Sequence, residues 1–546
     1  MAKVTVGEAL VQLLEAHQVQ TIYGVISIHN LPIADAVGRR ENIHFVCARG
    51  EAGALAMADA QARFAGLGVA LTSTGAGAGN AVGSLVEAYN ASSPVLHLTG
   101  QVESMYLDRE MGFTHEAKDQ LSFLRAASKA AYRILSPDQA VGILREAIRV
   151  ATTVPMGPVS VEIPSDIQAT EIELPADLQP VAPLKVPMAT GAEVSTLVQA
   201  LKSAKRPMIW AGAGALGALT EIKALADVGI PVVSSAHGRG ILADDHPRSL
   251  GAFHNAEPVQ QVIAAADLLV VVGSRLRSSE TKTYRLPLAD YVIQIDASPL
   301  AQQRNYLVNH FICGDSRDVL SRVVAQLEDH QWLDADYDER ILEAKQSAVD
   351  ALTEQLGVHA ELCFALRDAL PEDSILVRDV TRSGSTWGSR LFPVQKPLQN
   401  IHSLAGAIGL GLAHGIGAAA ANPDKKVVAL VGDGGLMLGL GEMATLVQEN
   451  SNLILLVMND GGYGVMRGIQ RRYFGDRQYF NQLHTPSYEQ IAKAMQCASF
   501  LVRSMEEFKR VIAEAVAIDG PAVVEVDMNA LGPFPTMGIG HPRDGW

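Results

Sequence analysis

The chain contains 546 residues, of which 48% are apolar and 19% are charged, and its formal net charge is −15. This composition is typical of a globular protein and argues against extended disorder, while the length exceeds what one hydrophobic core supports and indicates about three domains. A negative balance without a basic stripe provides nothing to neutralise phosphates, which excludes nucleic acid as a partner.

Further features predict a cytoplasmic protein without membrane contact. The four cysteines are widely separated and form no Cys-x-x-Cys pair, which fits a reducing compartment and neither a zinc site nor a disulfide framework. The N-terminal residues lack an apolar signal core. The uncharged stretch from Ser403 to Asn422 is built mainly from Gly and Ala and includes His414. We expect it to form a packed helix after a Gly-rich turn, and not a membrane span.

Helix and strand patterns alternate along three blocks of the chain. Residues 1–172 and 188–332 form the first two blocks, and a Pro-rich stretch from Leu174 to Pro187 separates them. A charged helical connection over residues 334–354 leads to the third block, residues 355–546. We expect a helix over 7–16 and strands over 44–47, 68–72, 158–163, 207–211, 230–234, 268–272 and 291–295. This alternation predicts the α/β class, with three domains that each contain a mostly parallel sheet flanked by helices.

Glu51 follows the strand 44–47 and opens an Ala-rich helix over residues 52–62. By itself, an acid in the first turn of a helix is explained by the helix dipole. The next strand, however, runs into the Gly-rich segment from Thr74 to Asn80, which we expect to be a flexible loop that approaches a ligand closely. The segment lacks the Gly-Lys-Ser/Thr of a P-loop. Its proximity in sequence strengthens the functional interpretation of Glu51.

The second block contains one motif that is typical of dinucleotide binding. Gly212 to Gly217 matches G-x-G-x-x-G after a strand, but the next strand is followed by Ala236-His237 and not by the acid that would bind the ribose. We therefore interpret the motif as a tight strand-to-helix turn and argue against NAD. A flavin or adenine nucleotide held in another way stays open.

Two Asp residues end buried-looking strands one βαβ unit apart in the third block. The strand 427–431 runs into Gly432-Asp433-Gly434-Gly435, and the strand 453–458 runs into Asn459-Asp460-Gly461-Gly462. Open α/β sheets bind ligands at the carboxyl ends of their strands. Carboxylates there, with glycines alongside, suit Mg²⁺ or Ca²⁺ and a phosphate. The alternative is a pair of ordinary turns, which the matched spacing disfavours.

Together these segments resemble the thiamine-diphosphate enzymes of the acetolactate synthase and 2-oxo acid decarboxylase superfamily, over essentially the whole chain. The resemblance implies a pyrimidine-binding domain at residues 1–172, a middle domain at 188–332 and a diphosphate- and metal-binding domain at 355–546. Its most specific part is the family's metal–diphosphate motif, in which Gly-Asp-Gly is followed, one strand later, by Asn-Asn or Asn-Asp. Gly432-Asp433-Gly434 and Asn459-Asp460 match this motif.

The resemblance implies that Asp433, Asp460 and the backbone carbonyl of Gly462 hold Mg²⁺ against the diphosphate. The family often has Asn where this chain has Asp460, and the extra charge is expected to tighten divalent binding and to oppose the diphosphate slightly. The full set of residues expected to bind the cofactor is Glu51, Asn80, Thr381, Ser383, Gly406, Ile408, Gly432, Asp433, Gly434, Gly435, Asp460, Gly462 and Tyr463.

By the same resemblance, Glu51 is the glutamate that hydrogen-bonds the aminopyrimidine ring. A carboxyl group in an apolar pocket can share a proton with a ring nitrogen and convert the 4-amino group to an imino base. That base would remove the thiazolium C2 proton to give the ylid that attacks a 2-oxo acid, with the cofactor as electron sink in the enamine stage. Ile408 matches the bulky apolar residue that wedges the cofactor into its bent shape.

The segment from Gly24 to Asn30 departs from the family's Gly-Val-Pro-Gly-Gly turn. Pyruvate decarboxylases carry an acid and benzoylformate decarboxylase a serine near position 28, whereas this chain carries an isoleucine. His29 is therefore the nearest candidate for proton transfer and the second expected catalytic residue; a loop histidine bonded to backbone is the alternative. The residues expected to line the substrate pocket are Ile28, His29, Asn30, His115 and Gln120.

The sequence thus predicts a thiamine-diphosphate- and Mg²⁺-dependent carboligase or lyase that acts on a 2-oxo acid, similar to acetolactate synthase. A homodimer or a dimer of dimers is expected, because the family holds the cofactor between the pyrimidine domain of one subunit and the diphosphate domain of its partner. A non-condensing decarboxylase similar to benzoylformate decarboxylase is the alternative within the family. A nucleotide- or flavin-dependent oxidoreductase that uses residues 212–217 is the alternative from another class.

Overall fold

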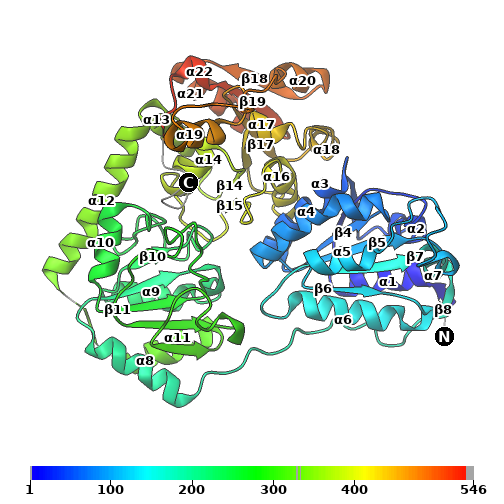
Figure 1. Ribbon diagram of the computed structural model, residues 1–546, viewed down its shortest axis with the longest axis horizontal. Coiled ribbons are helices and arrows are strands. Elements are labelled where there is room, and N and C mark those ends of the chain that lie inside the picture. Colours follow the sequence, from blue (N-terminus) through cyan, green and yellow to red (C-terminus); the bar gives the residue numbers. More distant parts are fainter. Residues whose placement is uncertain (1–2, 328–329, 333, 537–546) are drawn as a thin grey trace.

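Residues 3–327, 330–332 and 334–536 are described in the computed structural model. Figure 1 shows three α/β domains, with the C-terminal domain above the other two in the view. Along the lower edge, a long linker joins strand β8 (Glu171–Glu173) of the N-terminal domain to helix α8 (Gly191–Ser203) of the middle domain. Residues 174–190 of this linker contain neither helix nor strand, in agreement with their proline content.

The N-terminal domain has a six-stranded parallel sheet with the strand order β3-β2-β4-β5-β7-β6. A short strand β1 (Lys3–Thr5) pairs antiparallel with β8 beside it. Helices α1, α2 and α6 cover one face of the main sheet, and α3, α4 and α5 cover the other. The remaining strands are β2 (Thr21–Gly24), β3 (His44–Cys47), β4 (Gly68–Thr72), β5 (Val95–Gln101), β6 (Ala130–Arg133) and β7 (Val159–Pro164). The helices are α1 (Val6–Ala16), α2 (Leu31–Gly38), α3 (Glu51–Ala65), α4 (Ala76–Ala91), α5 (Gln120–Ala127), α6 (Ala140–Thr152) and α7 (Ser165–Ala169).

The middle domain has a five-stranded parallel sheet with the strand order β10-β9-β11-β12-β13. Helices α8, α9 and α11 pack on one face, and α10 and α12 pack on the other. Its strands are β9 (Pro207–Ala211), β10 (Val232–Ser234), β11 (Leu268–Val272), β12 (Val292–Asp296) and β13 (His310–Cys313). The other helices are α9 (Leu219–Asp227), α10 (Glu257–Ala265), α11 (Ser316–Leu327) and the connecting helix α12 (Ala335–Leu356).

The C-terminal domain repeats the six-stranded parallel plan with the strand order β15-β14-β16-β17-β19-β18. Helices α16, α18 and α20 cover one face, and α13, α15 and α21 cover the other. Its strands are β14 (Ile375–Arg378), β15 (Asn400–His402), β16 (Val427–Gly432), β17 (Leu453–Asn459), β18 (Ala498–Val502) and β19 (Ala522–Asp527). Its helices are α13 (Val358–Ala369), α14 (Arg382–Ser385), α15 (Trp387–Arg390), α16 (Gly411–Ala421), α17 (Asp433–Leu436), α18 (Glu442–Gln448), α19 (Gly464–Tyr473), α20 (Tyr488–Ala494), α21 (Met505–Val516) and α22 (Met528–Leu531).

The predicted α/β class with three mostly parallel sheets is confirmed. Central strands such as β4, β16 and β17 are buried along nearly their whole length because helices cover both faces, which explains their continuous apolar sequences. One local expectation is wrong. The segment from Ala76 to Asn80 forms the first turns of α4 and is not a flexible loop. Of its two glycines, Gly77 packs closely against Glu51 and Ser73, whereas Gly79 has open space around it, and sequence alone does not distinguish such a helix from a loop.

Helices α3 and α16 join the N-terminal and C-terminal domains within one hydrophobic core. Both helices are rich in Ala and Gly, and a Cβ added to Gly417 would collide with the backbone of Met57. Small residues therefore let the two helix backbones approach closely. This contact explains the low side-chain volume of the stretch 403–422, of which residues 411–421 form the expected packed helix.

In the middle domain, two of the three glycines of the G-x-G-x-x-G match are explained by packing, whereas a Cβ at Gly217 would meet open space. A Cβ added to Gly212 or Gly214 would collide with the loop at Gly273 and Ser274 after β11. Strand β10 ends at Ser234 without a following acid. The motif is therefore a close turn between two loops, and nucleotide or flavin binding there stays an untested alternative.

Candidate active site

Glu51 is the first residue of α3 and lies just beyond the carboxyl end of β3 in the parallel sheet. Its Oε2 accepts a hydrogen bond from Asn80 Nδ2 at 3.2 Å. A Cβ added to Gly77 would lie 2.7 Å from Glu51 Oε1, so this glycine leaves the space that the carboxylate needs. The structure thus brings the predicted residues Glu51 and Asn80 together, with Asn80 orienting the acid.

Glu442, at the start of α18, supports the beginning of the Glu51 helix from the C-terminal domain. Its carboxylate is 5% exposed and accepts hydrogen bonds from the backbone N–H of Arg49 at 3.1 and 3.2 Å. Burial raises the pKa of Glu442, while hydrogen bonds from Thr445 and from the backbone of Arg49 and Gly50 oppose the rise. A Cβ at Gly53 would collide with the carboxylate. The sequence gives no signal for this role of Glu442, because an acid in the first turn of a helix is explained by the helix dipole alone.

His29 and His115 lie beside each other near the carboxyl end of the N-terminal sheet. Their ring centroids are 5.2 Å apart, and His29 is 2% exposed. Burial and the neighbouring His115 lower the pKa of His29, while a hydrogen bond to the backbone carbonyl of Thr114 and the charge of Glu103 oppose the decrease. His29 Nε2 is buried without a hydrogen-bond partner in the described structure. The ring is thus neutral near pH 7 and presents one unengaged nitrogen.

The side chains of Asn30 and Gln120, also expected in the substrate pocket, form hydrogen bonds within the N-terminal domain. Asn30 donates to the carbonyls of Val25 and Thr72, each at 3.0 Å. Gln120 accepts from the Gly75 N–H at 2.7 Å and donates to Glu162 at 3.0 Å. Asn30 and Gln120 would therefore shape the wall of the expected substrate pocket. Ile28, in contrast, is 62% exposed.

Asp433 and Asp460 meet at the carboxyl ends of the adjacent strands β16 and β17. Asp433 Oδ1 accepts from the backbone N–H of Asp460 at 3.3 Å, and its Oδ2 accepts from that of Gly462 at 2.7 Å. Burial, followed by the charge of Asp460, raises the pKa of Asp433 to about 6. The hydroxyl of Tyr488 donates to the backbone carbonyl of Asp433 at 2.8 Å and fixes this turn.

The oxygen atoms of this turn fit a divalent cation that also binds an anion. Gly461 and Gly462 have φ values of 79° and 137°, and a Cβ at Gly434 would lie 3.0 Å from the Gly462 carbonyl oxygen and 2.9 Å from the ring of Tyr463. Glycines at these positions leave the backbone open to a phosphate. Within the described residues no group of three or more His, Cys, Asp and Glu side chains is arranged to hold a metal. A cation would therefore need backbone carbonyl and phosphate oxygens besides the two carboxylates.

The remaining predicted cofactor residues lie in two segments beside this turn. Thr381 Oγ1 accepts from the Gly384 N–H at 2.7 Å and so caps α14, whereas the hydroxyl of Ser383 is buried without a partner in the part of the chain that is described. Ile408 is 37% exposed on the loop that precedes α16, where Gly406 adopts a φ of 82°. The Thr381 hydroxyl thus caps its own helix, whereas the Ser383 hydroxyl has no hydrogen-bond partner among the described residues.

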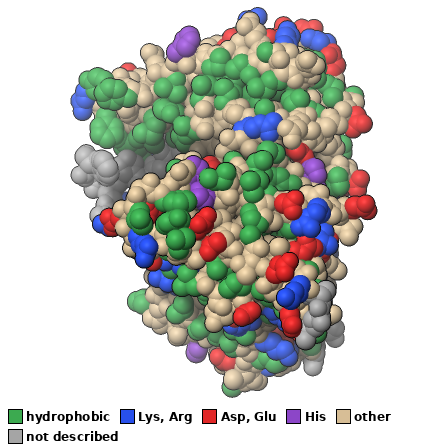
Figure 2. Space-filling view, turned by 90° about the vertical axis from the view of Figure 1, so that its right-hand side faces the viewer, with side chains coloured by type: hydrophobic (Ala, Val, Ile, Leu, Met, Phe, Trp, Pro, Cys, Tyr) green, Lys and Arg blue, Asp and Glu red, His purple; other side chains and the backbone are tan. Residues whose placement is uncertain are grey.

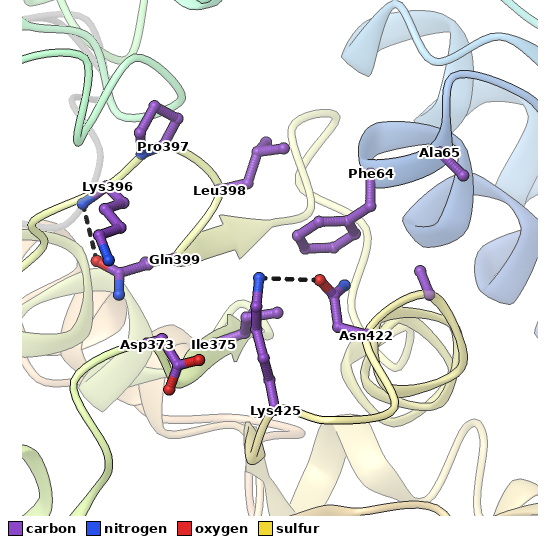
Figure 3. A pocket seen from close by; sticks show the side chains of 11 residues that line it. Phe64, Ala65, Asp373, Ile375, Lys396, Pro397, Leu398, Gln399, Asn422 and Lys425 are labelled. Carbon is purple, nitrogen blue, oxygen red and sulfur yellow. Dashed lines mark hydrogen bonds between the residues drawn. The ribbon is translucent and has the colours of Figure 1, made fainter.

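A cavity of about 450 Å³ lies elsewhere, between the end of α3 and the C-terminal domain. Figure 3 shows Phe64 and Ala65 at its upper right, Asn422 and Lys425 below them, and Lys396 at the left. Its lining contains neither Glu51 nor Asp433. This cavity is therefore not the site that the predicted residues define.

One parallel-sheet domain presents an oriented Glu51, and a second one presents paired carboxylates beside a glycine-rich turn. Three family models match the chain: the N-terminal TPP binding domain of thiamine pyrophosphate enzymes at residues 4–123, their central domain at 194–323 and their C-terminal TPP binding domain at 382–526. The chain therefore belongs to the thiamine pyrophosphate enzymes. Thiamine pyrophosphate is another name for thiamine diphosphate, so the predicted class of enzyme and its predicted organic cofactor are confirmed.

Curated relatives extend over nearly the whole chain. A probable acetolactate synthase large subunit of Methanococcus aeolicus is 28% identical over 95% of this chain and 91% of its own length. A probable 2-ketoarginine decarboxylase, AruI, of Pseudomonas aeruginosa is 28% identical over 96% and 94%, respectively. The acetolactate synthase isozyme 1 large subunit of Escherichia coli is 26% identical over 96% and 94%. These relatives confirm the predicted similarity to acetolactate synthase over nearly the whole chain.

Proposed function

We propose that this protein is a thiamine-diphosphate- and Mg²⁺-dependent carboligase or lyase that acts on a 2-oxo acid. The observation that carries the proposal is the pair of sites at sheet edges, with Glu51 held by Asn80 in one domain and Asp433 beside Asp460 in another. Asp433, Asp460 and the Gly462 carbonyl would hold the metal and, through it, the diphosphate. When bound, thiamine diphosphate supplies a carbon nucleophile and an electron sink.

The chain's own groups would bind and orient the cofactor and move protons. Glu51 would hold a proton at the pyrimidine ring, and Asn80 keeps its carboxylate in position. Ile408 would press between the two rings of the cofactor. The Nε2 of His29, which is buried without a hydrogen-bond partner in the described structure, would accept or return a proton on the substrate side.

The pair formed by His29 and His115 favours a second candidate, a decarboxylase that releases an aldehyde without condensation. Such an enzyme must protonate the reacting carbon before the product leaves, and a neutral imidazole near pH 7 can relay that proton. Because the Pseudomonas relative is a probable 2-ketoarginine decarboxylase, a 2-oxo acid with a guanidinium side chain is one substrate to include in tests.

We propose a homodimer or a dimer of dimers as the active form. Apolar side chains are exposed in both domains that contribute to the proposed site. Ile28 of the N-terminal domain and Leu438 of the C-terminal domain are each 62% exposed, and Met466 is 46% exposed. Figure 2 shows hydrophobic side chains gathered over much of the upper part of one face. Soluble monomers rarely expose contiguous apolar patches, so a second copy is the expected cover.

A cytoplasmic location is also proposed. The four cysteines are free, as expected in a reducing compartment. In the described part of the chain, no helix has the length and apolar character that crossing a membrane requires.

The test is a panel of 2-oxo acids with aliphatic, aromatic and guanidinium side chains, assayed for CO₂ release and for condensation products. The protein is assayed after removal of cofactor and metal, and again after adding thiamine diphosphate, Mg²⁺ or both. We expect turnover only with both. Condensation products support the carboligase, and CO₂ with stoichiometric aldehyde supports the decarboxylase. Turnover that needs NAD or a flavin and ignores thiamine diphosphate would contradict both.

A further inference from the structure

The carboxylate of Asp460 lies between two arginines. Its Oδ1 accepts a hydrogen bond from Arg467 Nη2 at 2.8 Å, and its Oδ2 lies 3.5 Å from Arg382 Nη1. Asp460 is 7% exposed, so these charges interact with limited screening by water. The sequence pointed to a single extra negative charge at this position, but the structure shows that two cations accompany it.

The surrounding residues are arranged for this contact. Arg467 lies one turn into α19, and its Nη2 also donates to the backbone carbonyl of Asp460 at 2.8 Å. A Cβ added to Gly464, the first residue of α19, would collide with both the Asp460 carboxylate and the Arg382 side chain. Gly464 therefore leaves the room in which Asp460 and Arg382 meet.

Charge balance explains why such a contact is needed here. Asp433 and Asp460 place two carboxylates next to each other, and a diphosphate would add more negative charge at the same point. One divalent cation cannot offset all of it. Like charges that lie close together in a poorly solvated site oppose one another strongly.

On the basis of the proposed function, we infer that Arg467, assisted by Arg382, is a positioning residue that offsets the charge of Asp460 and thereby permits a diphosphate to bind beside two carboxylates. The arginines also hold the carboxylate in a fixed direction, because a guanidinium hydrogen bond is directional. The inferred role disappears if Asp460 is replaced by a neutral amide.

The test is a double-mutant cycle with Arg467→Gln and Asp460→Asn, read out as binding of thiamine diphosphate in saturating Mg²⁺ by calorimetry. In the wild-type background, Arg467→Gln is expected to weaken binding about tenfold or more, because it removes the nearer of the two cations that pair with a buried carboxylate. In the Asp460→Asn background, the same change is expected to cost less than about threefold, since coupled residues are non-additive. Arg467→Lys, which keeps the charge, is expected to bind better than Arg467→Gln.

Arg471→Gln provides the matched control on the same helix, because the Arg471 side chain is 48% exposed and pairs with Asp476. It is expected to leave binding unchanged, and far-UV circular dichroism checks that each variant is folded. An equal loss from Arg467→Gln in both backgrounds would overturn the inference while leaving the proposed cofactor site intact. Failure of the wild-type protein to bind thiamine diphosphate with Mg²⁺ would contradict the proposed function as well.

Discussion

The carboxylate of Glu87 in α4 accepts a hydrogen bond from the backbone N–H of Ala405 at 2.9 Å, and the N–H of Leu404 donates to its other oxygen. Glu87 is fully buried. The far end of the same loop is held by Asp379, which accepts from the N–H of Gly409 at 2.9 Å. The N-terminal domain therefore fixes one end of the loop that carries the proposed cofactor wedge.

Replacing Glu87 by Gln is expected to destabilise this domain contact. Glu87 also lies 3.6 Å from Arg63, whose guanidinium bonds Asp59 at 2.6 Å inside the same interface. Loss of one member of a buried charged network costs about 3 kcal/mol. We expect a lower urea midpoint in circular dichroism and faster loss of thiamine diphosphate on dialysis. Glu514→Gln, on an exposed pair with Arg510, is the control. Equal midpoints for the two variants would contradict the assigned role of Glu87.

Glu51→Gln tests the activation of the cofactor. The amide can keep the hydrogen bond to Asn80 but cannot release and take up a proton at the pyrimidine ring. Hydrogen–deuterium exchange at C2 of bound thiamine diphosphate is expected to slow by about 10²- to 10⁴-fold, with Mg²⁺ binding retained. NMR of quenched samples measures the exchange. An unchanged rate would remove Glu51 from this role.

His29→Ala tests proton transfer through a pH–rate profile at saturating cofactor. Burial and His115 place the pKa of His29 below 6.5, so the ring is neutral at pH 7 and gains a proton only at lower pH. The folded state opposes protonation of His29. The free energy of unfolding therefore decreases as the pH falls below the pKa of an ordinary histidine. If His29 relays protons, kcat falls on the acid side and the variant loses both this dependence and most of its kcat.

The opposite outcome for His29→Ala is equally clear. A near-normal kcat with an unaltered profile, together with lower cofactor retention, would leave His29 as a structural residue. His44→Ala is the matched control, because that ring is 63% exposed and pairs with Glu449.

Assembly is tested by sedimentation velocity with Leu438→Asp. A charge at this exposed residue beside the Asp433 turn is expected to weaken a dimer that covers it, because the Asp side chain would be desolvated without a partner. We expect a shift from dimer or tetramer toward monomer and a parallel loss of activity. Leu307→Asp, at an 83% exposed residue of the middle domain, is expected to change neither. A fully active wild-type monomer at assay concentration would exclude the shared site.

The residues that could be predicted from sequence share a local signature. Asp433 and Asp460 each follow a continuous apolar strand and precede glycines, and Glu51 opens an Ala-rich helix. Glu87, Glu442 and Arg467 have no such signature. Within a helical pattern, a single charged residue looks like an ordinary solvated position, and only burial against a distant segment reveals otherwise.

The sequence alone determined the α/β class, the parallel sheets and the family, because strand burial and turn chemistry depend on neighbours within a few residues. Which charged groups meet depends on how distant segments pack. Glu442 reaches Arg49 and Glu87 reaches Ala405 across hundreds of residues, and Arg382 reaches Asp460 from a different strand end. Such contacts depend on how separate elements pack together, and no local pattern in the chain encodes that packing.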